Sequence, residues 1–213
     1  YDFALICREA FNNDIFVQFD GTTYYTLPPS IRNPEPTTVY AHHSMLKKNN
    51  KLYYDGIIGG KTGYTSKAGN TLVTCAKRDN LKLITVVLNG HKTHYSDTQK
   101  LLDFGFANFK SVSLDDYATE YNKVFRDIDI TGLGTEGDDV ISLYPSSKIT
   151  LPKEADIADA QSSLSYDPGK PAPEDAVARI GYTYGQHEIG CTYVLRKMQR
   201  QLTEISLTPE EPK

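Results

Sequence analysis

The spacing of apolar residues predicts helices and strands together in the first half of the chain. Phe3, Cys7 and Phe11 recur on one helix face, so a helix is expected to begin at the first residue. A second helix is expected after residue 96, where a Ser-x-x-Gln capping box precedes apolar residues on one face. Strand patterns lie between these helices, which indicates an α+β arrangement.

Two apolar, β-rich runs at residues 72–76 and 81–88 predict an antiparallel hairpin, because a polar segment separates them. The helix after residue 96 is expected to pack on this hairpin. Gly105 lies inside that helix and costs about 1 kcal/mol relative to alanine. We therefore expect tight packing against a neighbour at Gly105.

Between the first helix and this hairpin the pattern is less regular. Residues 15–25 alternate between apolar and polar side chains and predict a strand. The prolines of residues 28–36 lack backbone donors, which predicts a surface loop. Residues 38–48 are weakly helical, and Asn49-Asn50 predicts a turn before residues 57–60 lead into a Lys-Thr-Gly triplet.

From residue 111 onward the chain has only short apolar runs, separated by glycine, proline, aspartate and serine. The runs lie at residues 128–130, 140–143, 149–151, 177–184 and 189–195. Residues 166–173 predict a loop, and residues 185–188 fit a hairpin connection between the last two strands. The pattern predicts a separate all-β domain.

This change of pattern divides the chain into three expected segments. Residues 1–110 are expected to form the α+β unit and residues 111–200 the all-β domain. Residues 201–213 are polar and proline-rich, which predicts a linker or tail. A chain of 213 residues is long enough to bury the cores that this division requires.

Charge and reactive side chains exclude some functions. The formal net charge is −4 without a basic stripe, so no nucleic-acid partner is expected. Cys7, Cys75 and Cys191 lie in apolar segments and are expected to be small buried hydrophobes that reveal no disulfide framework. His91 and His94 form a His-x-x-His with no third ligand suggested, so we expect no metal and no cofactor. Surface positions are expected for all five histidines: His42, His43, His91, His94 and His187.

Nothing in the sequence indicates a targeting or anchoring segment. No apolar run approaches the roughly 20 residues of a membrane-spanning helix, and no secretory leader is found at Tyr1. The sequence opens without methionine, directly in helical periodicity. We therefore expect Tyr1 to be an artificial or processed start and any such signal to lie outside the sequence.

The segment around the Lys-Thr-Gly triplet carries the strongest functional signal. It reads Gly56-Ile57-Ile58-Gly59-Gly60-Lys61-Thr62-Gly63-Tyr64-Thr65-Ser66-Lys67-Ala68-Gly69, followed by Ala76-Lys77-Arg78 and Leu83-Ile84-Thr85-Val86-Val87-Leu88. The order and spacing of these motifs resemble those of the serine-type D-alanyl-D-alanine carboxypeptidases, which are low-molecular-mass penicillin-binding proteins. The resemblance extends to residues 1–11 and 101–106 and, more loosely, to the β-rich tail.

The resemblance implies that residues 1–110 are the C-terminal part of a β-lactamase/DD-peptidase-like catalytic domain, an antiparallel sheet with helices. It implies a small β-sandwich-like domain after it, and membrane association through a segment outside the sequence. The implied activity removes the terminal D-alanine from peptidoglycan stem peptides through an acyl-enzyme. The implied location is the extracytoplasmic bacterial cell envelope, and the implied inhibitors are β-lactams.

Five residues are the expected substrate-binding residues: Lys61, Thr62, Gly63, Tyr64 and Thr65. Lys61 supplies a cation and Thr62 a hydroxyl for the terminal carboxylate. Gly63 lets a peptide approach the strand edge, so that the substrate adds as a further strand. The backbone N–H of Tyr64 is the candidate donor to an oxyanion.

The nucleophile departs from the family pattern. Family members carry Ser-x-x-Lys and Ser-x-Asn elements upstream of the helix that matches residues 1–11, and neither is found at that place. The catalytic serine is therefore unassigned, the chain alone is expected to be inactive, and the missing N-terminal half is an expected partner. His94 stands where relatives often carry arginine, so its role in binding carboxylate is open.

Ser44-Met45-Leu46-Lys47 fits Ser-x-x-Lys by its letters and would place Ser44 and Lys47 one helical turn apart. Aligned with the family, these residues fall on a structural segment just before the Lys-Thr-Gly triplet. We therefore do not assign Ser44 as the nucleophile.

Two other functions stay open. A non-catalytic peptidoglycan-binding or scaffold protein would keep the carboxylate-binding strand, although its exposed sheet edge and apolar surface would need a partner. A β-lactamase carries the same triplet but usually lacks a trailing β domain, so residues 111–213 disfavour it.

Overall fold

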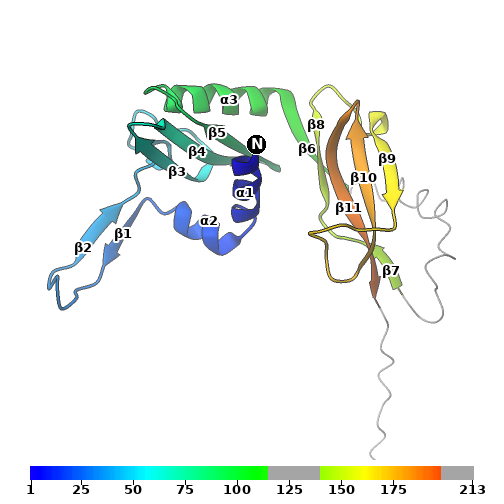
Figure 1. Cartoon of the computed structure of the whole chain (residues 1–213), viewed down its shortest axis with the longest axis horizontal. Helices are drawn as coiled ribbons and strands as arrows, with labels where there is room; N and C mark the ends of the chain where they lie inside the picture. Colours follow the sequence, from blue (N-terminus) through cyan, green and yellow to red (C-terminus); the bar gives the residue numbers. More distant parts are fainter. Residues whose placement is uncertain (115–139, 198–213) are drawn as a thin grey trace, which may run out of the picture. The chain divides into compact units, whose positions relative to one another are not determined.

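The computed structural model describes residues 1–114 and 140–197. Two compact units are distinguished: residues 1–111 together with 152–155, and the remaining described residues (Figure 1). The first unit combines helices with antiparallel strands, whereas the second consists of strands with one short 3-10 helix. The α+β class expected from the sequence is confirmed.

A three-stranded antiparallel sheet forms the centre of the first unit. It contains β3 (Ile57–Thr65), β4 (Gly69–Arg78) and β5 (Leu81–Val87), in that order. The hairpin expected from the two apolar runs is therefore confirmed as β4 and β5. The Lys-Thr-Gly triplet lies within β3, with Lys61 opposite Val73, rather than before the strands as the sequence suggested.

Helix α3 (His94–Asn108) packs against β4 and β5, as expected. A Cβ atom on Gly105 would lie 2.5 Å from Leu83 Cδ1, so the predicted close packing at this glycine is confirmed. The predicted capping box at Ser96 is wrong, because the helix begins at His94. Ser96 Oγ instead donates to the Thr93 carbonyl at 2.9 Å. Thr93 Oγ1 donates to the Gly90 carbonyl at 2.6 Å, which ties the turn before the helix.

Helix α1 (Asp2–Ala10) is confirmed at the start of the chain. Cys7 of this helix and Phe11 at its C-cap are buried in a cluster with Val73 and Cys75 of the sheet. A second cluster lies on the side of α3 and contains Met45, Tyr54, Leu72, Ala76 and Leu102. The sheet is therefore covered by apolar side chains from separate segments.

The strand expected at residues 15–25 is wrong for most of its length. Residues Asp14–Asp20 form helix α2, because the Asn13 side chain accepts a hydrogen bond from Phe16 N at 3.1 Å and caps the first turn. Asp14 in that turn also suits the positive end of a helix. Only the end of the predicted range is a strand, β1 (Tyr24–Leu27).

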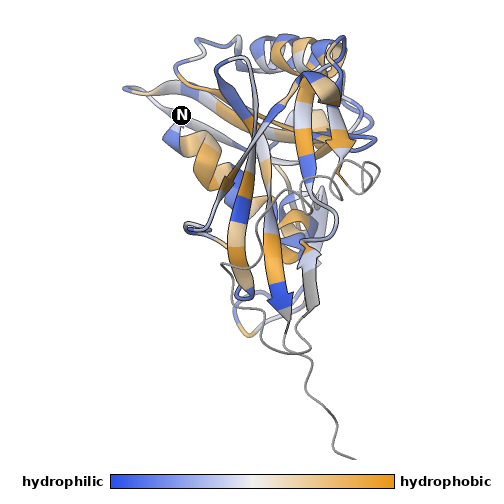
Figure 2. Cartoon of the chain, turned by 90° about the vertical axis from the view of Figure 1, so that its right-hand side faces the viewer, coloured by the Kyte–Doolittle hydropathy of each residue, from blue (hydrophilic) through white to orange (hydrophobic). Residues whose placement is uncertain are grey.

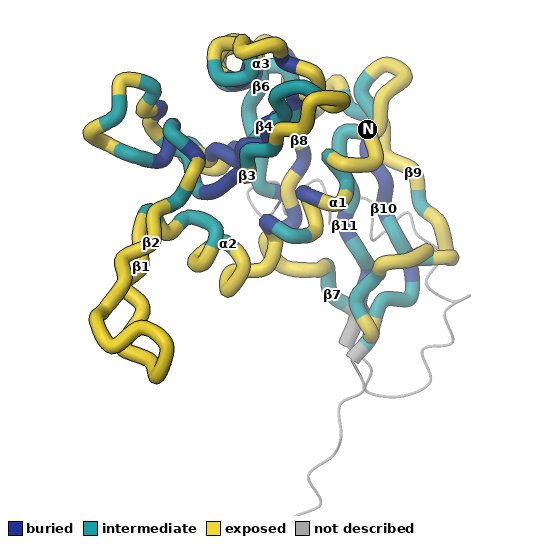
Figure 3. The backbone as a smooth tube through the Cα atoms, turned by 60° about the vertical axis from the view of Figure 1, so that its left-hand side comes forward, coloured by how far each residue is buried: buried dark blue, intermediate teal, exposed yellow. Residues whose placement is uncertain are grey.

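Strand β1 pairs with β2 (Thr37–Tyr40) in an antiparallel ribbon. The proline-rich residues between them form the loop predicted for 28–36. The weakly helical assignment of residues 38–48 is wrong, because β-branched residues pair across the ribbon and only Ser44–Leu46 forms a 3-10 turn, η1. Every residue of both strands is exposed (Figure 3).

The second unit is built from antiparallel strands. A four-stranded sheet has the order β7 (Val140–Leu143), β11 (His187–Lys197), β10 (Ala176–Tyr184) and β9 (Gln161–Ser165). Strands β6 (Phe109–Ser113) and β8 (Lys148–Pro152) form a two-stranded sheet, with residues 109–111 and 152 assigned to the first unit, and the 3-10 helix η4 (Ile157–Asp159) precedes β9. Polar and apolar segments succeed one another along these strands (Figure 2).

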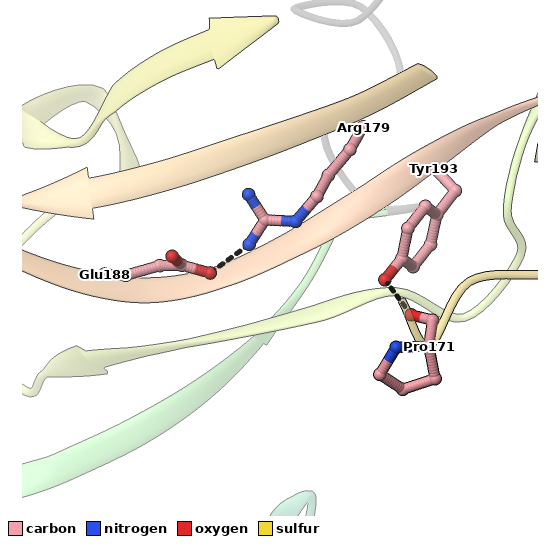
Figure 4. Close-up of polar contacts among 4 residues, drawn as sticks. All are labelled: Pro171, Arg179, Glu188 and Tyr193. Atoms are coloured by element: carbon pink, nitrogen blue, oxygen red, sulfur yellow. Dashed lines mark hydrogen bonds and ion pairs between the residues drawn. The ribbon is translucent and has the colours of Figure 1, made fainter. Parts of the chain in front are cut away.

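The hairpin between β10 and β11 is confirmed with a shorter connection than expected, since Tyr184 already pairs with His187. Arg179 and Glu188 form an ion pair across these strands (Figure 4). Tyr193 Oη donates to the Pro171 carbonyl at 2.9 Å and fastens the loop predicted at residues 166–173 (Figure 4). The described strands of this unit agree with the all-β prediction.

Two expectations concern residues outside the described part: the apolar run at 128–130 and the tail at 201–213. Cys7 and Cys75 are buried as expected, whereas Cys191 is partly exposed. Within residues 1–114 and 140–197, no helix is long and apolar enough to cross a bilayer.

Candidate functional site

Strand β3 carries all five residues expected to bind substrate. Lys61, Tyr64 and Thr65 are exposed, whereas Thr62 and Gly63 are half-buried. In the described part of the chain β3 pairs only with β4, so its other edge is open. The five residues therefore lie along an accessible sheet edge.

One hydrogen bond shows which backbone groups face this open edge. Gly60 N donates to Asp20 Oδ2 of α2 at 2.6 Å, so the N–H of Gly60 points away from β4. Pairing is regular from Gly60 to Thr65, and N–H directions alternate along a strand. The N–H groups of Thr62 and Tyr64 consequently face the same open edge.

Asp20 is a site residue that the sequence did not indicate. It ends a helix, where a carboxylate meets the negative end of the helix dipole, so a specific partner is needed. That partner is the N–H of Gly60. Burial raises the pKa of Asp20, while the Gly60 hydrogen bond and the charge of Lys61 oppose the rise.

His43 is a second residue that the sequence misplaced, since it was expected at the surface and is only 2% exposed. Its Nδ1 accepts a hydrogen bond from Met45 N at 3.3 Å, so the ring proton lies on Nε2, which donates to Thr74 Oγ1 at 2.8 Å. Burial lowers the pKa of His43 to about 4, with a smaller contribution from His94 in the same direction. His43 is therefore a neutral core histidine.

The lack of a side chain at Gly60 leaves space for the His43 ring beside β3. A Cβ atom at Gly60 would lie 2.3 Å from the Val73 carbonyl oxygen and 2.5 Å from His43 Cδ2. No larger residue fits without moving β3. The reason for a glycine at position 60 is clear only from the folded structure, in which the His43 ring lies against it.

A cavity of about 300 Å³ opens beside this part of β3. Its lining includes Phe19, Asp20, Tyr40, Gly60, Lys61 and Thr62. Lys61 Nζ donates to the Thr62 carbonyl at 2.5 Å. Lys61 and Thr62 thus bring a cation, a hydroxyl and one backbone N–H on the open edge to the rim of one cavity, which suits recognition of a carboxylate.

Other candidates from the sequence lie apart from this arrangement. In the described residues no hydrogen bond joins Ser44 Oγ to Lys47 Nζ; Ser44 N donates to Tyr95 Oη at 3.2 Å. His94 begins α3 with its ring 4.5 Å from Tyr95, half-buried rather than at the surface, and does not line the cavity. No three metal-binding side chains cluster in the described ranges.

A Lys-Thr-Gly triplet is one of the sequence elements of penicillin-binding proteins and β-lactamases, and here it lies on the open edge of an antiparallel sheet. Residues 1–92 match the sequence profile of one family, described as D-alanyl-D-alanine carboxypeptidase. Residues 1–92 are thus similar to the D-alanyl-D-alanine carboxypeptidase family.

Curated relatives agree with this assignment. The chain is 36% identical over 95 residues to the D-alanyl-D-alanine carboxypeptidase DacA of Escherichia coli, covering 42% of this chain and 23% of the relative. It is 30% identical over 115 residues to DacB2 of Mycobacterium tuberculosis, covering 50% and 36%. The chain thus spans about a quarter to a third of the length of these relatives.

Solved structures of similar fold include penicillin-binding protein 5 from Haemophilus influenzae, with a TM-score of 0.48 and 20% identity over 85% of this chain and 50% of that one. Another is an evolved putative penicillin-binding protein homolog from Mycobacterium tuberculosis, with a TM-score of 0.40 and 30% identity over 48% and 38%.

Proposed function

We propose that the intact protein is a serine-type D-Ala-D-Ala carboxypeptidase and that β3 holds the substrate's terminal carboxylate. The observation that supports this is the convergence of Lys61 and Thr62 at the cavity rim, on the open edge of β3. Both residues lie in the region that matches the carboxypeptidase family. Lys61 offers charge and Thr62 a hydroxyl to the carboxylate.

In the proposed reaction a serine oxygen attacks the carbonyl carbon between the two D-alanines and its proton passes to a lysine base. The N–H of Tyr64, on the open edge, stabilises the negative oxygen that forms. The amide bond then breaks, D-alanine leaves with the proton on its amine, and water hydrolyses the serine ester. Gly63 leaves room for the peptide to lie against β3.

We assign neither the serine nor its lysine to a residue of this sequence, and Ser44 is not proposed for the role. By this proposal the chain on its own binds substrate without turning it over, because loss of the nucleophile costs about six orders of magnitude in a comparable serine site. The proposed substrate is a peptidoglycan stem peptide, the proposed inhibitors are β-lactams, and the proposed location is the cell envelope.

The test uses the full-length protein, labelled with a fluorescent penicillin and assayed for D-alanine release. Lys61→Ala and Thr62→Val should each lower the rate of acylation by about 100-fold, as expected for loss of a charged or hydroxyl contact in the transition state. Lys67→Ala, at an exposed position of the first unit, and Thr183→Val, in the second unit, should leave the rate within twofold.

A full-length protein that forms no covalent adduct and releases no D-alanine contradicts the carboxypeptidase assignment. If that protein still binds stem peptide, and Lys61→Ala abolishes the binding, the non-catalytic peptidoglycan-binding function takes its place.

A further inference from the structure

A cavity of about 310 Å³ lies in the first unit, away from the candidate site, and is here called the basic cavity. The turn between β4 and β5, the end of α3 and the residue after β8 line it, with residues 78–81, 106, 109–111 and 153. Arg78 lies five residues further along β4 than Val73, the strand partner of Lys61, or about 17 Å at strand spacing. The basic cavity is therefore separate from the proposed carboxylate site.

The lining of the basic cavity has a surplus of positive charge. Arg78, Lys110 and Lys153 are cationic, and Asp79 is the one acidic side chain among the lining residues. The C-terminal end of α3 contributes about half a negative charge, which still leaves the lining positive. The sign is opposite to that of the chain as a whole, whose formal net charge is −4, so an anion is the ligand that this cavity attracts.

Arg78 is held in place by the protein itself. Its guanidinium lies over the rings of Tyr54 and Phe106, 4.6 and 4.5 Å from their centroids. Its Nε and Nη2 donate to the Asp55 carbonyl at 3.3 and 3.2 Å. Arg78 thus contributes its charge to the cavity, but its planar set of donors is already engaged and does not offer the full bidentate grip that suits a carboxylate.

The two lysines differ from Arg78 in this respect. Among the described residues, neither Lys110 Nζ nor Lys153 Nζ has a hydrogen-bond or ion-pair partner, and Asp79 pairs with neither. The backbone places both at the end of α3, since Lys110 follows the C-cap residue Phe109 and Lys153 N donates to the Asn108 carbonyl at 2.8 Å. Two ammonium groups are therefore available to a ligand at one cavity.

The rest of the lining suits an organic group beside the anion. Leu81, Phe106 and Phe109 supply apolar side chains, and Asn80 and Ser111 supply further hydrogen-bond donors. The volume of the cavity is about ten times the ~30 Å³ of one water molecule, which is more than a bare ion fills.

We propose that the basic cavity binds a phosphate ester. The phosphate oxygens accept hydrogen bonds from Lys110 and Lys153, and the organic part lies against Phe106 and Phe109. Phosphate is favoured over carboxylate because lysines act as separate point charges that several oxygens can share, whereas the guanidinium that would grip a carboxylate is engaged. The inference is independent of the proposed carboxypeptidase function, since none of these residues lies in the Lys-Thr-Gly segment.

The experiment measures binding to the full-length protein by isothermal titration calorimetry, with phenyl phosphate, inorganic phosphate and benzoate. Phenyl phosphate should bind about five-fold more tightly than inorganic phosphate, which lacks the ring, and than benzoate, which lacks the phosphate. Lys110→Gln and Lys153→Gln should each weaken phenyl phosphate binding about 10-fold, as expected for loss of one charge-assisted hydrogen bond. Lys100→Gln, exposed on α3 outside the lining, should leave it within twofold.

Co-sedimentation with vesicles distinguishes two sources of the phosphate ester. Sedimentation with phosphatidylcholine vesicles that requires added phosphatidylglycerol, and that is lost in Lys110→Gln and Lys153→Gln, identifies a lipid headgroup. Binding of phenyl phosphate without such sedimentation identifies a soluble ester. Both results support the proposal.

Three results would overturn it. Neither phenyl phosphate nor the vesicles bind, or the glutamine variants bind phenyl phosphate as tightly as wild type, or benzoate binds as tightly as phenyl phosphate, so that the cavity does not select phosphate. Thermal unfolding identifies a variant that fails to fold. Lys153 is exposed, so Lys153→Gln should unfold at the wild-type temperature and keeps the test valid if Lys110→Gln does not fold.

Discussion

His43 Nε2 donates a hydrogen bond to Thr74 Oγ1 across 2.8 Å and so joins the segment before η1 to the middle strand of the sheet. Met45 N donates to the other ring nitrogen, so both nitrogens are used by the neutral ring. Since the ring also lies against Gly60, this pair of residues fixes the strand that carries Lys61 and Thr62. His43 therefore belongs to the buried core and also supports the strand of the candidate site.

The free energy of unfolding should therefore fall in mild acid. A pKa of about 4 in the folded protein, below the ordinary value of 6.5, means that His43 contributes stability above pH 6.5 that is lost as pH falls toward 4. The loss between pH 7 and pH 5 is about 2 kcal/mol, measured by urea unfolding. In His43→Gln, which has no titrating ring, that part of the pH dependence should be absent; an unchanged slope would contradict the account.

Asp20 offers a test in which charge and hydrogen bonding separate. Asp20→Asn keeps an oxygen that accepts from Gly60 N, and it removes a carboxylate whose pKa is raised by burial. Because a raised pKa means that ionisation destabilises the fold as pH rises above 3.8, Asn should be at least as stable as Asp at pH 7. Asp20→Ala leaves the Gly60 N–H unpaired and should cost about 1–3 kcal/mol in urea unfolding at pH 7.

A comparison at pH 3 completes this test, because Asp20 is then protonated in wild type and the difference between wild type and Asp20→Asn should shrink. Equal losses in Asp20→Asn and Asp20→Ala at pH 7 would mean that the charge, not the hydrogen bond, matters.

Gly105 and Leu83 should show a coupled effect on stability. Gly105→Ala improves helix propensity by about 1 kcal/mol but places a Cβ atom 2.5 Å from Leu83 Cδ1, so the single variant should be destabilised by about 1–3 kcal/mol. In a Leu83→Ala background the colliding atoms are gone, and the same change should stabilise by up to about 1 kcal/mol. Thermal unfolding of the four proteins measures this reversal; strictly additive effects would refute the collision.

The ion pair between Arg179 and Glu188 should contribute little. Their side chains are 28% and 55% exposed, and partly exposed pairs are screened by water and salt. Glu188→Gln should therefore change the free energy of unfolding by less than about 1 kcal/mol, and by still less in 1 M salt. Tyr193→Phe removes the hydrogen bond to the Pro171 carbonyl from the same hairpin. It is the matched comparison variant in the same unfolding measurements.

Sequence patterns predicted the elements whose signals are local. Strands β4 and β5 have long apolar runs with a polar turn between them, and α3 has enough turns to show its apolar face. Helix α2 has 7 residues, too few for helical and strand periods to differ clearly, and Asn13 as a cap was the usable signal. Strand β2 was missed and β1 was predicted only at its first two residues, because these strands have no buried face to produce an alternating pattern.

In the candidate site, too, the sequence indicated only the residues whose signal is local. Lys61, Thr62 and Gly63 were found because they form a contiguous motif. Asp20 and His43 were not found, because their hydrogen-bond partners lie 40 and 31 residues away in the sequence and no local pattern indicates the pairing. Only the folded sheet shows that Gly60 is bound by one of them and covered by the other.

The contact between Asp20 and Gly60 also limits how a peptide can slide along β3. Strand pairing alone tolerates slippage by two residues, because every second residue of an edge presents the same backbone groups. Here the donor that a slipped peptide would need at Gly60 is already taken. In the proposed complex, the end of helix α2 therefore limits the substrate peptide to one register through backbone groups alone, whatever side chains the peptide carries.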